Sequence, residues 1–413
     1  MRRRIRIMAA VVALLDGGLT GAGALVQEPA PRAVVGRGDE AERARLAADL
    51  SELDKHTEMW AASNDEFLRK LAATRLPAWR SAAERDDPTA SFLLGRCLHE
   101  GLGVEPDPPA GAERLRKAAE AGLPEAMFYL AAAYGQGKGI EKDPEKGRSW
   151  IKRAAELGCP SGMVTYGILH FTGDATGGAP DVPGGLAWYT RAIESGSSLA
   201  MSMLGDLYLL GAGEAVPAEP AKAVEWYRRA SEAGNAVAMK TRGLMYEEGR
   251  HVQVDHDEAV SWYRKAVALG YSGAMVNLGN CHAVGRGVPR DERKAFELYL
   301  QAVELGNPTG MNNLGGCYLN GAGVARDERL AYRWTKRAAD AGSPDGMNSL
   351  GVYYRKGIGT ADDHGLAFKW LSRAAEADDR RAMRNLSDCH HLGIGTHVDL
   401  DMAATWIRRA ESE

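Results

Sequence analysis

The stretch Ser272–Gly306, SGAMVNLGNCHAVGRGVPRDERKAFELYLQAVELG, decides the fold of this chain. In its first half Met275, Leu278 and His282 fall at helical spacing, so they share one face of a first helix. Two glycines interrupt the pattern, and helical spacing returns through the apolar residues of AFELYLQAV. Gly306 follows this second helical segment and is expected to end it, because glycine tolerates the positive φ that helix ends commonly adopt. The stretch therefore predicts two short helices joined by a turn.

The same pattern returns along most of the chain, at intervals of 36 or 38 residues. One mark is a methionine after a small residue, at Met127, Met163, Met201, Met239, Met275, Met311, Met347 and Met383. A second mark is the glycine of a Leu-Gly pair, or its substitute, at Gly95, Ala131, Gly167, Gly205, Gly243, Gly279, Gly315, Gly351 and Ser387. Two marks in one register predict an all-α solenoid of about nine helix-turn-helix repeats, each burying its apolar face against its neighbours.

Large rings and thiols also recur at fixed positions of the repeat. One tryptophan per repeat is expected to fill the core from the second helix, at Trp150, Trp188, Trp226, Trp262, Trp334, Trp370 and Trp406. Four of the five cysteines stand two residues after the marker glycine, at Cys97, Cys281, Cys317 and Cys389. Equivalent positions of adjacent repeats lie about 8–10 Å apart, too far for a disulfide. We therefore expect buried free thiols.

The motifs resemble the Sel1-like repeat (Sel-one-like repeat, SLR), a relative of the tetratricopeptide repeat. They are Ala-Met-x-x-Leu-Gly, Gly-x-Gly-Val with a following Asp, Ala-x-x-Trp-Tyr and Ala-Ala-Glu-x-Gly, and they cover residues 88–413. Ala131 and Ser387 depart from the pattern at the marker glycine, and Arg242 replaces the leucine before it. The resemblance implies a helical solenoid that serves as an adaptor in membrane-associated or exported complexes.

The sequence before the repeats divides into three expected segments. Residues 1–24 combine four arginines, a short apolar stretch and small residues, as in a secretory signal peptide, and residues 25–38 read as a disordered linker. Residues 39–87 are expected to form a helical cap that includes a degenerate half-repeat. If the leader is a signal, the protein is exported to the periplasm, the exterior or a secretory lumen; otherwise it is cytoplasmic.

Composition and motifs argue against most chemistry. A net charge of −4 without a basic patch disfavours nucleic-acid binding, and the sequence predicts neither a cofactor nor a metal site. Ser149 and Lys152 form a Ser-x-x-Lys pair, as in β-lactamases, but the partner motifs of that class are missing. His282 and His390 take a place that other repeats give to tyrosine, so we expect hydrogen-bonded core rings. No enzyme activity is predicted, although a β-lactamase-like hydrolase stays the alternative.

A stripe along the first helix is the expected partner-binding surface. The stripe positions lie three residues before, one after and four after the marker glycine, and by resemblance to the tetratricopeptide groove they face the concave side. The candidate residues are Phe128, Val164, Ile168, Phe171 and Leu209 in the apolar half, and Asn280, Asn312, Asn348, Arg355, Arg384, Asp388 and His391 in the polar half. Alternatively, the apolar half merely packs inside the superhelix.

The sequence thus predicts a scaffold that binds a partner protein or an extended peptide in a concave groove. A self-assembling structural protein is a further alternative, since the last repeat has no covering helix in the sequence and exposes Trp406 and Ile407 to self-association.

Overall fold

The computed structural model describes residues 40–57, 61–212 and 216–411, and this part of the chain contains twenty helices and no strand. The predicted all-α solenoid is confirmed. The segments expected to form a signal peptide and a linker, residues 1–24 and 25–38, lie outside the described residues. None of the described helices combines the length and the apolar character needed to cross a membrane.

Each repeat is a pair of short helices, as the sequence predicts. The first helices are α4 (Pro88–Glu100), α6 (Pro124–Gln136), α8 (Pro160–Thr172), α10 (Ser198–Leu210), α12 (Ala236–Glu248), α14 (Ser272–Val284), α16 (Pro308–Asn320), α18 (Pro344–Lys356) and α20 (Arg380–Leu392). The second helices are α5 (Pro108–Glu120), α7 (Pro144–Glu156), α9 (Val182–Glu194), α11 (Pro220–Glu232), α13 (His256–Ala268), α15 (Glu292–Glu304), α17 (Glu328–Asp340), α19 (His364–Glu376) and α21 (Leu400–Glu411).

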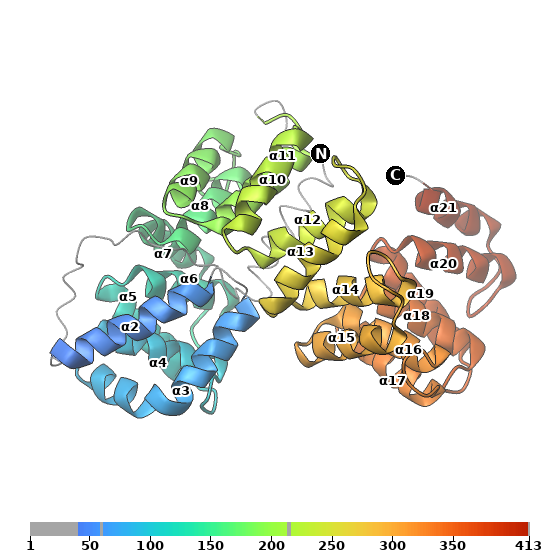
Figure 1. The fold of residues 1–413 in the computed structure, drawn as a ribbon, viewed down its shortest axis with the longest axis horizontal. Helices are drawn as coiled ribbons and strands as arrows, with labels where there is room; N and C mark the ends of the chain where they lie inside the picture. The colour runs from blue at the N-terminus through green and yellow to red at the C-terminus, as the bar shows by residue number, and fades with distance from the viewer. Residues whose placement is uncertain (1–39, 58–60, 213–215, 412–413) are drawn as a thin grey trace. The chain divides into compact units, whose positions relative to one another are not determined.

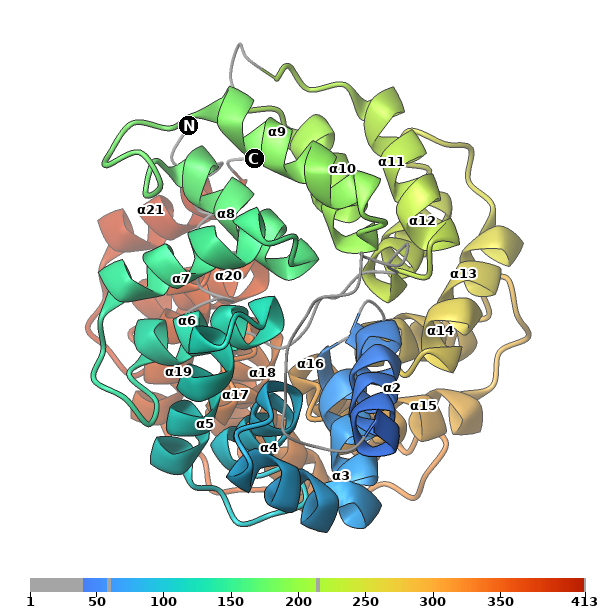
Figure 2. The same ribbon diagram turned by 90° about the vertical axis from the view of Figure 1, so that its left-hand side faces the viewer.

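The helices pack as two compact units, and each is described by itself. The first unit holds the described residues up to Met245 with Gly249–Gln253, and the second holds Tyr246–Glu248 with Val254–Glu413. In the first unit α4 to α9 follow one another side by side (Figure 2). In the second unit the helices α13 to α21 continue the same alternation (Figure 1).

Two helices precede the repeats in the first unit, α2 (Glu40–Thr57) and α3 (Ala61–Glu84). Trp79 of α3 is fully buried, and its indole nitrogen donates a 2.9 Å hydrogen bond to Asp49 of α2. Arg114 of α5 donates to the carbonyl oxygen of Ala83 at 2.8 Å. These contacts tie both helices to the first repeat, which is the position a cap requires.

Recurring polar and glycine residues fix the ends of the helices. All second helices except α11 begin after an aspartate, such as Asp291, whose carboxylate accepts the backbone N–H of Lys294. First helices end in a glycine with left-handed backbone, such as Gly285 at φ 80°. The second glycine of each Gly-x-Gly has another role: a Cβ on Gly287 would collide with the carbonyl oxygen of His256 in the preceding repeat. The Gly-x-Gly motif is therefore a packing requirement as well as a turn.

The tryptophan register differs from the expected core. Only Trp262 is buried, whereas the other six repeat tryptophans are half-buried. A cation three residues further along the helix covers each ring, as Lys265 does at 3.7 Å from the Trp262 centroid. The fully packed position is the next one along the chain, with Ile151, Tyr189, Tyr227, Tyr263, Tyr299, Thr335 and Leu371 all buried. The tryptophans therefore form the edge of the core, and the residues after them form its centre.

The cysteines provide a test of the packing. All five are buried, and the four at the predicted position are free thiols, as expected. Burial raises the pKa of the Cys97 and Cys281 thiols to about 12 and of Cys317 to about 11. Because the thiolate is the reactive form, native protein at pH 8 should leave all five thiols unreacted with a disulfide reagent. Denatured protein should react at all five. Fewer than five in denaturant would mean that a disulfide exists.

Two adjacent glycines of α16 allow a matched test of helix packing. A Cβ at Gly315 would lie 2.5 Å from the Thr335 hydroxyl oxygen, whereas a Cβ at Gly316 would meet nothing within 4 Å. Gly315→Ala should lower the free energy of unfolding by roughly 1–3 kcal/mol through overpacking. Gly316→Ala should raise it by about 0.5–1 kcal/mol through helix propensity. Chemical denaturation measures both, and equal effects would disprove the close approach at Gly315.

Candidate functional site

The first helices form the inner layer of each unit. Successive first helices pack on one another, α4 on α6 and α6 on α8 in the first unit, and α14 on α16 and α16 on α18 in the second. In the described part of the chain no two second helices pack as closely. A layer whose members lie closer together is the concave one. We call it the first-helix face, and the predicted stripe positions lie on it.

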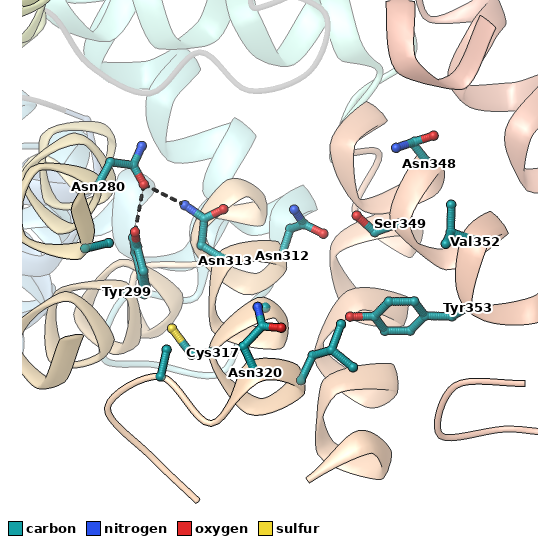
Figure 3. Close-up of a pocket in the computed structure, with 14 residues that line it drawn as sticks. Asn280, Tyr299, Asn312, Asn313, Cys317, Asn320, Asn348, Ser349, Val352 and Tyr353 are labelled. Carbon is teal, nitrogen blue, oxygen red and sulfur yellow. Dashed lines mark hydrogen bonds between the residues drawn. The ribbon is translucent and has the colours of Figure 1, made fainter. Parts of the chain in front are cut away.

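In the second unit this face contains a hollow of 440 Å³ (Figure 3). Its lining comes from α14, α15, α16, α18 and the turn after α16, and it carries no charged side chain. The lining residues are Asn280, Ala283, Tyr299, Asn312, Asn313, Gly316, Cys317, Leu319, Asn320, Ala322, Asn348, Ser349, Val352 and Tyr353. The hollow thus brings together three of the sequence-predicted residues, Asn280, Asn312 and Asn348, one from each of three successive first helices.

Hydrogen bonds fix the orientation of the Asn280 carboxamide. Its Oδ1 accepts the Tyr299 hydroxyl at 2.7 Å and the Asn313 Nδ2 at 3.1 Å (Figure 3). Both lone pairs of the oxygen are therefore used, and the Nδ2 group of this exposed residue is left to donate. Tyr299 is buried in the second helix and also reaches the first-helix face with its hydroxyl.

The other two asparagines differ in how firmly they are held. Asn348 is buried, and its Oδ1 accepts the Asn385 Nδ2 at 2.8 Å, so its own Nδ2 is left to donate. Asn312 lies between them on α16, and its Oδ1 is buried without any hydrogen-bond partner. An unpaired buried oxygen costs about 1–3 kcal/mol. Asn313 and Asn385 position the two flanking amides.

The remaining polar candidates lie outside the hollow. Arg355 of α18 and Asp388 of α20 form an ion pair with 4.0 Å between nitrogen and oxygen. Arg384 and His391 are exposed on α20. The structure therefore separates the predicted polar stripe into a hollow and an exposed charged end.

The apolar candidates of the first unit are packed. Phe128, Val164, Ile168 and Phe171 are each at most 5% exposed, and Leu209 is half-buried. The Phe171 ring lies 5.2 Å from the Tyr189 ring, centroid to centroid. Their burial favours the alternative that this half of the stripe serves internal packing. Truncating Phe171 is therefore expected to lower the free energy of unfolding by opening a cavity. A side chain that only anchors a partner would not have this effect.

Sequence reasoning missed charged residues at the same stripe positions. In the first unit Asp206 accepts the Tyr227 hydroxyl at 2.5 Å, and burial raises the pKa of its carboxyl group. Burial likewise lowers the pKa of Lys240. In the second unit Glu247 accepts the Tyr263 hydroxyl at 2.7 Å. The sequence did contain a signal for these hydrogen bonds. Each acceptor occupies a stripe position, and each tyrosine follows the repeat tryptophan or its equivalent.

The chemical candidates do not assemble into a site. Ser149 is exposed on α7, and Lys152 lies 3.9 Å from the Glu156 carboxylate. His282 and His390 are buried as expected, but the Nδ1 atom of each has no hydrogen-bond partner, so these rings are only partly satisfied. Across residues 40–57, 61–212 and 216–411 no three His, Cys, Asp or Glu side chains gather closely enough to hold a metal ion.

Comparison with known proteins agrees with this architecture. The Sel1 repeat family matches nine consecutive segments, at residues 88–123, 124–159, 160–197, 198–235, 237–271, 272–307, 308–343, 344–379 and 380–412. No curated protein matches the chain. The chain is therefore a helical-repeat protein, and its repeats cover most of its length. Within that class, the chain belongs to the Sel1 repeat family.

Solved structures include proteins with similar repeats. A Sel1 repeat protein from Oxalobacter formigenes is 28% identical, with 78% of this chain and 93% of that chain covered and a TM-score of 0.48. A protective antigen of uropathogenic Escherichia coli strains, displaying an SLR fold, is 26% identical, with 81% and 79% covered and a TM-score of 0.45. Family membership rests on the nine repeat matches.

The shared acceptor on Asn280 can be tested by a double-mutant cycle. Tyr299→Phe and Asn313→Ala each remove one donor to the Asn280 Oδ1, and each should lower the free energy of unfolding by about 1 kcal/mol. Because both donors act on one oxygen, the double variant should deviate from additivity by at least about 0.5 kcal/mol. Additive losses in urea denaturation would show that the two bonds are independent.

Proposed function

We propose that this chain is a scaffold that binds a partner polypeptide through the hollow on the first-helix face of the second unit. The proposal rests on one observation: three predicted groove asparagines from successive repeats line a single uncharged hollow of 440 Å³. Repeat solenoids commonly bind partners along their concave surfaces. Sel1 repeat proteins in general are interaction scaffolds, which supports a scaffold function for this chain. This general role names no partner.

The hydrogen-bonding state of Asn312 also supports binding rather than folding as its role. An oxygen that is buried without a donor lowers the stability of the free protein. Residues that lower stability and line a concave surface are typical of functional sites. By the same reasoning, a partner would use the hollow rather than the packed apolar stripe of the first unit.

Asn312→Leu tests this proposal, because it removes the unpaired oxygen and retains a side chain of similar size. The free energy of unfolding should stay the same or rise by up to about 2 kcal/mol, while capture of the native partner should fall at least about tenfold. Affinity capture from the native source with immobilised wild-type protein, followed by mass spectrometry, identifies the proteins to compare.

A matched control lies on the outer layer. Arg293 of α15 is 82% exposed and pairs with the exposed Glu297, so Arg293→Ala should leave both stability and capture nearly unchanged. If every captured protein binds Asn312→Leu as well as it binds the wild type, the hollow is not the binding surface. Loss of capture in Arg293→Ala alone would place that surface on the second helices.

A further inference from the structure

The hollow carries a specific order of hydrogen-bonding groups across three helices. Asn280 on α14 and Asn348 on α18 are fixed as donors, because their oxygens already accept hydrogen bonds inside the protein. Turning either amide over would break those bonds. Asn312, between them on α16, loses no bond when its amide turns over, since its Oδ1 has no donor. The row therefore consists of a donor, an adjustable group and a donor (Figure 3).

A polypeptide main chain supplies the complementary order. Carbonyl oxygens can accept from Asn280 and Asn348, and an intervening N–H can donate to the Asn312 Oδ1 after its amide turns. That last bond satisfies an oxygen that is unpaired in the free protein, while the Asn312 Nδ2 group takes the place of this oxygen on the buried side. The lining also includes the apolar residues Leu319 and Val352, which are available to contact a small apolar side chain.

Charged groups find no counter-charge in this hollow. Its only titratable residues are Tyr299, Tyr353 and Cys317, and burial raises the pKa of all three, to about 11 for the thiol, so each is neutral at pH 7. A carboxylate or ammonium group entering here would give up part of its hydration and gain no counter-charge. The lining thus selects against charge as well as for amides.

We propose that the hollow recognises an uncharged, extended segment of main chain, with Asn312 accepting one of its N–H groups. This inference rests on the proposed function, and it specifies the chemistry of the bound segment. The partner would bind here through a run of neutral residues, and any charged residues would lie outside that run.

Selection from a displayed library of short random peptides supplies the probe. Full-length wild-type protein and Asn312→Leu are used as parallel targets, and peptides retained only by the wild type are synthesised with blocked ends. We expect a central run without Asp, Glu, Lys or Arg. Placing lysine or glutamate in that run should weaken binding at least about tenfold, and N-methylation of one central amide should do the same.

A second variant protects the test against indirect effects. Asn312→Asp keeps the acceptor but adds a negative charge, so it should now retain lysine-containing peptides that the wild type rejects. Wild-type-specific peptides with a charged central run, or with full tolerance of N-methylation at every position, would overturn this inference and leave the proposed function standing. Recovery of no peptide that depends on Asn312 would count against both.

Discussion

Close approach between helix backbones is the constraint on which the rest of the structure depends. The marker glycine of the first helix faces the second helix so closely that a Cβ at Gly279 would lie 2.6 Å from the Tyr299 ring, and one at Gly351 would lie 2.7 Å from Leu371. The second glycine of the Gly-x-Gly turn meets the preceding repeat in the same way. Contacts within and between repeats thus favour residues with little or no side chain. These contacts explain why glycine recurs with the period of the fold.

This close packing also determines what reaches the first-helix face. A tyrosine buried in the second helix lies so near the first that its hydroxyl extends past the backbone to a polar stripe residue. Tyr227, Tyr263 and Tyr299 do so in successive repeats, with Asp206, Glu247 and Asn280 as acceptors. The core and the candidate binding surface are therefore connected by hydrogen bonds. A stripe residue held in this way keeps its orientation without help from a ligand, which lowers the entropic cost of binding.

The period, the helix ends and the buried thiols could be predicted because each depends on one residue type in one register. The tryptophans could not be placed from their register alone, since a cation such as Lys265 lies over each ring and leaves it at the edge of the core. Phe171 and Asn280 illustrate the same difficulty on the stripe. Both occupy predicted groove positions, yet Phe171 is buried against Tyr189 and Asn280 borders a hollow. Whether a stripe residue is buried or borders a hollow depends on the volumes of the side chains around it. The spacing of residues in the sequence does not give those volumes.

Volume accounts for the presence of the hollow in the second unit. The stripe position after the marker glycine holds Arg96 and Ile168 in the first unit, both buried, but Gly316 in the second, where a Cβ would meet nothing within 4 Å. The position four residues after that glycine holds Phe171 in one and Ala283 in the other. Large residues therefore fill the face around Ile168 and Phe171, and small ones leave room around Ala283 and Gly316. Since the backbone repeat is the same in both, a solenoid of this kind can gain or lose a binding site through stripe residues alone, without any change in its helix packing.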